Sequence, residues 1–312
     1  MFKTKMNPNL LGLLPVFIWG ISIPVSKMLM MKLGFLAVMG GVQVICGTLG
    51  MLNQTYLVKR KIPKDIFWNP YFYVRGAFFI GHIFLIFLAN ALITKNNVSL
   101  IILLNYFWPT AIILSSIALA GVRVTRPVFF VAGIILVLAS LSFEILKPEN
   151  IAMASLGEGW DGLACVLAFI AAILWGLYSA ISRKIGDETG GSSAVPVYQI
   201  VLGTTLFLSF IPGMATWENL DAPTAIMFIG YGILMFIAYI CWDVGMRKGN
   251  IVFLSLCADF VPWISLTTAW ILLDADLTVK TILSGVMLVF GAIITRYGTL
   301  VKKQIPQDLP PE

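Results

Sequence analysis

The sequence predicts an all-α integral membrane protein with ten transmembrane helices arranged as a 5+5 inverted repeat. Of its 312 residues, 59% are hydrophobic and only 12% are charged, whereas soluble domains carry about 25% charged residues. Apolar runs of about 20 residues, the length that crosses a bilayer, follow one another along the chain, and motifs of the first half return in the second. This composition excludes a soluble enzyme, and we expect no catalytic activity.

Apolar runs between charged residues or Pro, Gly and Asn breaks define the ten predicted spans. The first five cover residues 10–29, 33–57, 71–93, 98–120 and 127–146, and the second five cover 162–182, 194–215, 222–244, 251–273 and 279–300. The predicted domains are accordingly a first repeat (1–147), an extracytoplasmic linker (148–161), a second repeat (162–301) and a cytoplasmic tail (302–312). The first run is long and has no small-residue cleavage site, so we expect a retained span rather than a signal peptide.

The distribution of Lys and Arg predicts the orientation of the spans. Ten spans place both termini on one side, and that side collects 15 of the 21 basic residues; the opposite side has 5, and Arg75 lies just inside the third span. The positive-inside rule therefore predicts that both termini are cytoplasmic, in a multi-pass protein of the bacterial inner membrane. The basic excess reflects loop orientation, so we expect no nucleic-acid partner.

The two halves share motifs at nearly constant spacing. A Trp-Gly pair followed by hydroxyl and basic residues occurs twice, 156 residues apart, as Trp19-Gly20 with Ser22, Ser26 and Lys27, and as Trp175-Gly176 with Tyr178, Ser182 and Arg183. A second set recurs at a shift of 153, as Asn90, Asn97 and Pro109, and then as Asp243, Asn250 and Pro262. Because five is an odd number, the second copy crosses the membrane in the opposite direction, which is typical of secondary transporters.

Two ionisable side chains lie deep within predicted spans, His82 in the third and Asp259 in the ninth. An ionisable group inside a membrane is costly unless it meets water or a partner. We therefore predict that both line a polar cavity. The alternative for His82 is a packing residue held by hydrogen bonds.

Pro109 and Pro262 lie in the middle of their spans at matching places. Each removes a backbone N–H and releases a carbonyl four residues earlier, on Asn105 and Ala258 respectively. Broken helices of this kind form binding sites in transporters, so we predict hinges at both prolines and a site beside them. The alternative is a pair of purely structural kinks.

Aromatic residues follow helical spacing on several spans. Trp19 and Trp175 each begin a face continued by hydroxyl side chains, and Tyr239 and Trp242 lie on one stripe of the eighth span. Tyr106 and Trp108 are two residues apart, so we expect only one, Trp108 in preference, to face a cavity unless the proline unwinds the helix. The predicted substrate-binding residues are Trp19, His82, Asn105, Tyr106, Trp108, Trp175, Tyr178, Tyr239, Trp242 and Asp259.

These features resemble the drug/metabolite transporter superfamily, EamA type. The Trp-Gly pairs and the five-plus-five layout carry this resemblance, and the stretches NYFWPTAIILSSI (105–117) and AYICWDVGMRKGNI (238–251) resemble the aromatic amino acid exporters within it. The resemblance implies a basket of spans 1, 3, 4, 6, 8 and 9 around a central cavity, with spans 5 and 10 peripheral. The sequence departs from the exporters at Asp259, where a neutral residue such as Tyr is expected, and at His82, where an acid can occur.

We therefore predict a secondary transporter that exports aromatic or other large neutral amino acids and related metabolites by alternating access. Aromatic rings would pack the substrate's side chain, while Asp259, Asn105 and the freed carbonyls would bind its charged head. One alternative is a transporter, or an importer, of a cationic metabolite such as S-adenosylmethionine or a quaternary amine, which the buried Asp259 favours. Another is a non-transporting membrane scaffold or a channel-like subunit.

Few other partners are expected. No phosphate-binding loop or metal-ligand cluster occurs in the sequence, so we expect no cofactor and no metal. The predicted partners are the small-molecule substrate and the lipid bilayer, and a monomer is the simplest expectation for the assembly state.

Overall fold

The computed structural model describes residues 7–58, 64–145, 160–185 and 188–301. The helices of the first half are α1 (Pro8–Leu33), α2 (Phe35–Leu52), α3 (Pro70–Leu92), α4 (Val98–Asn105), α5 (Trp108–Leu119) and α6 (Pro127–Ile145). Those of the second half are α8 (Asp161–Ile185), α9 (Ala194–Gly203), α10 (Ala222–Lys248), α11 (Ile251–Ala258), α12 (Val261–Leu273) and α13 (Val279–Tyr297). A π-helical turn, Asn53–Val58, extends α2, and a 3-10 segment, Thr204–Phe210, extends α9.

Each predicted span corresponds to a helix or to a pair of consecutive helices. Within the described residues, eight helical segments are long and apolar enough to cross a membrane. The fifth and seventh predicted spans correspond to shorter apolar helices, Pro127–Phe143 and Ala194–Phe210. These helices fit a multi-pass membrane protein, whereas the count of ten spans and the inverted repeat stay predictions. The predicted tail (302–312) and most of the predicted linker (148–161) lie outside the described residues.

Two spans are broken where the sequence places a proline. The break between α4 and α5 is formed by Tyr106 and Phe107, and the break between α11 and α12 by Asp259 and Phe260. Pro109 and Pro262 occupy the second positions of α5 and α12, where the missing N–H costs nothing and the ring prevents the preceding helix from continuing.

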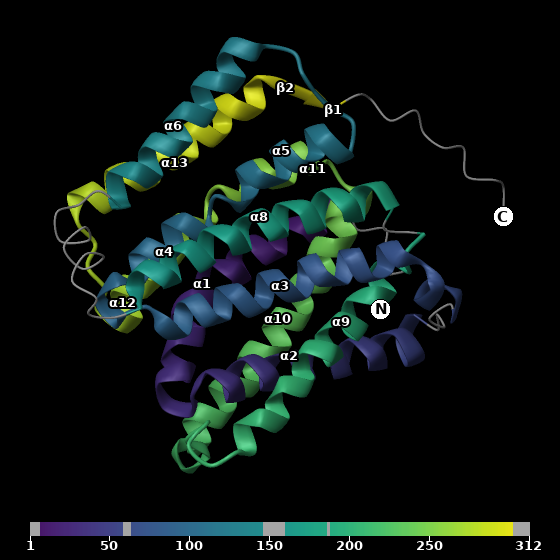
Figure 1. Cartoon of the computed structure of the whole chain (residues 1–312), viewed down its shortest axis with the longest axis vertical. Helices are drawn as coiled ribbons and strands as arrows, with labels where there is room; N and C mark the ends of the chain where they lie inside the picture. Colours follow the sequence, from purple (N-terminus) through teal and green to yellow (C-terminus); the bar gives the residue numbers. More distant parts are fainter. Residues whose placement is uncertain (1–6, 59–63, 146–159, 186–187, 302–312) are drawn as a thin grey trace.

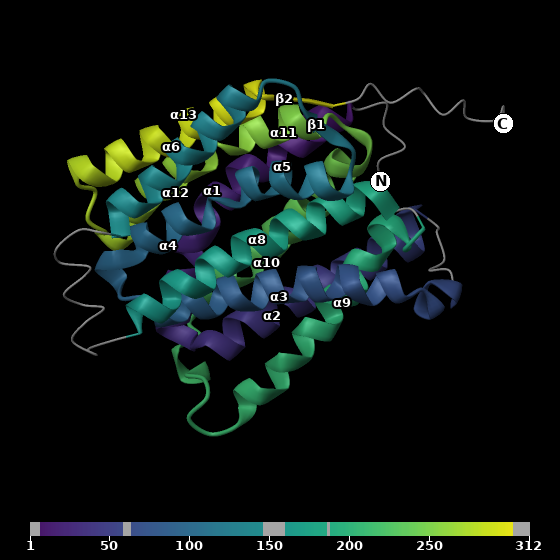
Figure 2. The same ribbon diagram turned by 45° about the horizontal axis from the view of Figure 1, so that its top comes forward.

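Helices α6 and α13 pack against each other along one flank of the molecule, as Figure 1 and Figure 2 both show. Glycines permit this close approach: a Cβ atom on Gly291 would lie 2.8 Å from the backbone nitrogen of Val137. The remaining long helices, α1, α3, α8 and α10, lie together on the other side of α5 and α11 (Figure 1). This arrangement agrees with the peripheral position expected for the fifth and tenth spans.

A short antiparallel pair of strands, which the all-α prediction lacks, joins the two halves. β1 (Val122–Val124) pairs with β2 (Thr299–Val301), and Arg123 lies opposite Leu300. The tenth span was predicted to continue to residue 300, but α13 ends at Tyr297. Valine and threonine favour extended backbone, and the carbonyl of Gly298 accepts hydrogen bonds from the N–H groups of Thr125 and Arg126.

The glycine of each Trp-Gly pair marks a close crossing between the two halves. A Cβ atom on Gly176 of α8 would lie 2.6 Å from the carbonyl carbon of Ala111 in α5. The equivalent atom on Gly20 of α1 would overlap the side chain of Ile264 in α12. In each half, the glycine therefore allows the first long helix to cross closely over the second segment of the broken span in the other half. Helix α1 crosses α12, and helix α8 crosses α5.

Two basic residues hold corresponding helix ends within each half. The Lys27 ammonium donates hydrogen bonds to the carbonyls of Asn90 (2.8 Å) and Ile93 (2.5 Å), at the end of α3. The Arg183 guanidinium donates to the carbonyls of Met246 (2.9 Å) and Gly249 (2.7 Å), at the end of α10. In both cases the two accepting carbonyls lie 63 and 66 residues after the basic residue. These contacts are favourable because the C-terminus of a helix carries a partial negative charge.

Candidate functional site

A cavity lies beside the break between α4 and α5, and helices α1, α3, α8 and α10 supply most of its wall. Its free space is about 50 Å³, which accommodates a few water molecules and is smaller than the 300–1,000 Å³ or so of typical ligand pockets. The described conformation is therefore contracted around the site. The lining residues are Trp19, Ser22, Ile23, Ser26, His82, Ile86, Phe87, Asn90, Asn105, Tyr106, Trp108, Trp175, Tyr231, Met235 and Tyr239.

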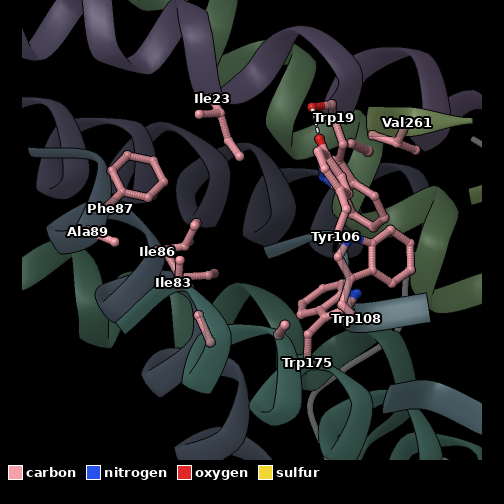
Figure 3. Close-up of a cluster of buried hydrophobic side chains, with 14 of the residues drawn as sticks. Trp19, Ile23, Ile83, Ile86, Phe87, Ala89, Tyr106, Trp108, Trp175 and Val261 are labelled. Carbon is pink, nitrogen blue, oxygen red and sulfur yellow. Dashed lines mark hydrogen bonds between the residues drawn. The ribbon is translucent and has the colours of Figure 1, made fainter. Parts of the chain in front are cut away.

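The structure brings seven of the ten predicted binding residues to this cavity: Trp19, His82, Asn105, Tyr106, Trp108, Trp175 and Tyr239. Both Tyr106 and Trp108 line it, because the chain leaves the helix between them. Figure 3 shows these two side chains next to Trp19 and Trp175. The Tyr106 hydroxyl donates a hydrogen bond to the carbonyl of Trp19, at 3.1 Å.

Trp19 is the centre of an aromatic cluster drawn from both halves. Its ring is edge-on to Trp175, with 5.4 Å between ring centroids and an interplanar angle of 89°, and edge-on to Trp108 at 5.8 Å and 87°. Trp242 lies against Trp19 at 5.0 Å and against Trp108 at 5.3 Å, but it is outside the lining. Edge-to-face pairs contribute about 0.5–1.5 kcal/mol each beyond buried area, so these rings form a rigid wall.

His82 lines the cavity and also packs against its wall. Its Nδ1 atom lies 2.8 Å from the carbonyl oxygen of Ala171, and its ring centroid lies 4.6 Å from that of Trp175. A carbonyl oxygen can only accept, so this contact fixes the proton on Nδ1 and makes Nε2 the acceptor in the neutral imidazole. The two interpretations of His82 from the sequence, cavity lining and packing, therefore describe the same side chain.

Two asparagine side chains supply amide groups to the lining. The Nδ2 group of Asn90 donates hydrogen bonds to the Ile23 carbonyl (2.9 Å) and to the Ser26 hydroxyl (2.8 Å). Asn105, at the end of α4, has no side-chain hydrogen bond to any described residue, and its Oδ1 atom is buried. A buried polar atom without a partner is costly, so Asn105 is ready to bind a ligand or water.

Asp259 lies apart from the cavity lining. It occupies the break between α11 and α12, where its two carboxylate oxygens accept hydrogen bonds from the Arg296 guanidinium of α13; the Nη2 to Oδ1 distance is 2.9 Å. The ninth span, expected to surround the cavity, contributes none of the lining residues. A buried carboxylate requires a counter-charge, and spacing along one helix does not reveal a partner 37 residues away.

A buried ionic network closes the space between α3, α8 and α10. The Arg75 guanidinium donates hydrogen bonds to the Asp243 carboxylate (2.8 Å), the Ser182 hydroxyl (2.8 Å) and the Gly191 carbonyl (3.0 Å). Arg247 donates to the other carboxylate oxygen of Asp243, at 2.9 Å. From the sequence, Arg75 and Asp243 are expected near span ends, where charged groups reach water, but both are fully buried here.

Tyr178 connects this network to the aromatic cluster. Its ring centroid lies 5.1 Å from that of Trp175, and its hydroxyl oxygen lies 3.4 Å from Nη2 of Arg75. It is outside the cavity lining, as Trp242 is. The network therefore lies directly behind the aromatic wall, on the side that the sequence predicts to be cytoplasmic.

Comparison with known proteins finds transporters. Residues 162–297 match the EamA-like transporter family. The second half of the chain is thus similar to EamA-like transporters. The aromatic amino acid exporter YddG of Escherichia coli (strain K12) is 22% identical to this protein over 306 residues, which cover 95% of this chain and 99% of the exporter.

Two further relatives and one solved structure are also similar to this chain. YddG of Salmonella typhimurium (strain 14028s / SGSC 2262) is 22% identical over 302 residues, covering 95% of this chain and 99% of that exporter. An uncharacterized transporter of Clostridium kluyveri is 23% identical over 153 residues, covering 48% of this chain and 49% of its own. A protein crystal structure has the same fold, with a TM-score of 0.65, 20% identity, and coverage of 92% of this chain and 96% of that one.

Proposed function

We propose that this protein is an EamA-family transporter that exports aromatic or other large neutral amino acids and related metabolites by alternating access. The observation that supports the substrate class is the cavity wall, in which Trp19 and Trp108 of the first half meet Trp175 and Tyr239 of the second. Such rings pack an apolar side chain and attract an ammonium group over their faces. The distant homology to aromatic amino acid exporters supports the same class.

Paired features of the two halves support alternating access. Both halves have one span broken before a proline, one Trp-Gly crossing and one basic residue that binds the end of another helix. An inverted pair of units can rock about a central site and expose it to each side in turn. The Arg75–Asp243 network would then close the site on the predicted cytoplasmic side and open when that side is exposed.

Transport of a cationic metabolite, by export or by import, is the weaker candidate. It depends on a carboxylate in the cavity, and Asp259 binds Arg296 instead. The test of the proposed function is counterflow in proteoliposomes that contain only this protein. We expect saturable exchange of radiolabelled tryptophan, with inhibition by phenylalanine and tyrosine. A flux equal to that of empty liposomes would support the scaffold alternative, and a flux above that level that rises linearly with concentration would support the channel alternative.

A further inference from the structure

Among the described residues, the lining of the cavity contains no acidic residue, no Lys and no Arg, and His82 is its one ionisable group apart from tyrosine. The buried carboxylates Asp243 and Asp259 already have cationic partners, Asp243 in Arg75 and Arg247 and Asp259 in Arg296. A ligand with a net charge would thus enter a low-dielectric space without a counter-charge, which is strongly unfavourable inside a membrane protein. A zwitterion or an uncharged ligand avoids this cost.

Among the polar side chains of this lining, Asn105 is the one suited to bind the ligand's head. The Nδ2 group of Asn90 already donates to Ile23 and Ser26, which leaves only its Oδ1 atom free to accept. The hydroxyls of Ser22 and Ser26 donate to the carbonyls of Trp19 and Ile23. Asn105 is only 6% exposed and has no side-chain partner in the described part of the chain. An amide both donates and accepts, so it can bind an ammonium and a carboxylate on the same ligand.

The position of Asn105 fits this role. It is the last residue of α4, and α5 begins three residues later, at Trp108. The end of one helix carries a partial negative charge and the start of the next carries a partial positive charge. The break therefore offers opposite partial charges beside one amide group, which suits a head that bears both an ammonium and a carboxylate.

From these observations we infer that the cavity selects ligands of zero net charge, and that Asn105 is the specificity residue that binds their polar head. The inference rests on the proposed function, because it assumes that this cavity is the substrate site. It adds a rule that the aromatic wall alone does not give: cationic and anionic analogues with the same ring are rejected.

The test measures calorimetric binding to the purified full chain, separately from transport. Four indole compounds differ mainly in charge: tryptophan is a zwitterion, tryptamine a cation, indole-3-propionate an anion, and indole-3-acetamide uncharged. We expect tryptophan to bind at least about tenfold more tightly than tryptamine or indole-3-propionate. Tryptamine binding as tightly as tryptophan would overturn the selection by charge.

Variants at Asn105 test the residue itself. Asn105→Ala should weaken tryptophan binding about tenfold, and equal affinity of native protein and variant for tryptophan would overturn the role of Asn105. Asn105→Asp should shift the preference towards tryptamine by about tenfold. Asn69→Asp is the matched control, because it makes the same charge change at the exposed start of α3, where Asp is an equally good cap.

The two proposals fail in different ways. Charge-selective binding without counterflow would overturn the proposed export and leave the inference standing. Counterflow of tryptophan and tryptamine at equal rates and affinities would overturn the inference and leave a transporter. Absence of binding by all four compounds would overturn both.

Discussion

Asp259 and Arg296 join the break between α11 and α12 to the peripheral helix α13 through a buried, two-point ion pair. The corresponding break in the first half is tied differently, because the Tyr106 hydroxyl donates to the Trp19 carbonyl on α1. One break is thus fixed to the cavity wall and the other to the flank of the molecule. The two breaks have different neighbours despite their matching position in the sequence.

Removing the charge of Asp259 should therefore destabilise the protein rather than change its substrate. Asp259→Asn leaves the Arg296 guanidinium buried without a counter-charge, which costs about 3–5 kcal/mol in comparable buried pairs. We expect a lower midpoint of thermal unfolding and an unchanged order of preference among amino acids. The double variant Asp259→Asn with Arg296→Gln should recover part of the stability. Native stability combined with an altered substrate preference would place Asp259 in substrate binding after all.

Trp108 should control the discrimination between aromatic and aliphatic substrates. Trp108→Ala removes its ring contacts with Trp19 and Trp242 and opens space in the cavity wall. We expect the preference for phenylalanine over leucine, measured as a ratio of counterflow efficiencies, to fall about tenfold. Trp270→Ala, at an exposed position of α12, is the control. The prediction fails if the two variants discriminate equally well.

The two prolines should matter for turnover more than for binding. Pro109→Ala and Pro262→Ala each remove the ring that stops the preceding helix, so the span becomes more continuous and less able to bend. We expect a several-fold slower maximal exchange with tryptophan affinity within about twofold. Pro127→Ala, at the start of the peripheral helix α6, should exchange at the native rate. Native rates in both proline variants would make these breaks purely structural.

Two introduced cysteines, each added to the four native ones, test the orientation of the chain. The loops after the second and ninth spans are predicted on opposite sides of the membrane. Asp65→Cys and Asp276→Cys replace exposed residues in these loops. An impermeant maleimide should label Cys at 276 in intact cells, and at 65 only after permeabilisation, with the unsubstituted protein as background. Labelling of both from outside would contradict the predicted topology.

Asp221 should give the thermal stability a dependence on acid pH. Hydrogen bonds from Thr224 hold the pKa of this carboxyl below its ordinary value of 3.8, and the N–H of Thr224 lies 2.8 Å from Oδ1. The pKa of this carboxyl is lower in the folded than in the unfolded protein, so the ionised carboxylate stabilises the fold. This contribution is complete above the unfolded pKa and is lost as pH falls through the folded pKa. Native protein and Asp221→Ala should thus differ in unfolding midpoint near neutral pH and converge in acid. A difference in unfolding midpoint of the same size in acid as near neutral pH would count against this origin.

Much of the site follows from local sequence, but its ionic partners do not. Pro109 and Pro262 predict both breaks because a proline acts on its own helix, and the Trp-Gly pairs predict Trp19 and Trp175 in one wall because the motif repeats. Local spacing does not reveal the partner of Asp259. It also does not reveal that Arg75 is buried against Asp243, which lies 168 residues further along the chain, because both contacts depend on how the helices pack. The recurrence of Asn90 as Asp243 was the available signal, because an amide replaced by an acid in one repeat calls for a new cation nearby.

The contacts of Lys27 and Arg183 bear on relative movement of the two halves. Each basic residue binds a helix end of its own half, through the same sequence offsets, and neither needs the other half to do so. Because both contacts are internal to one half, they would persist if one half moved relative to the other. The end of α3 would then travel together with α1, and the end of α10 together with α8.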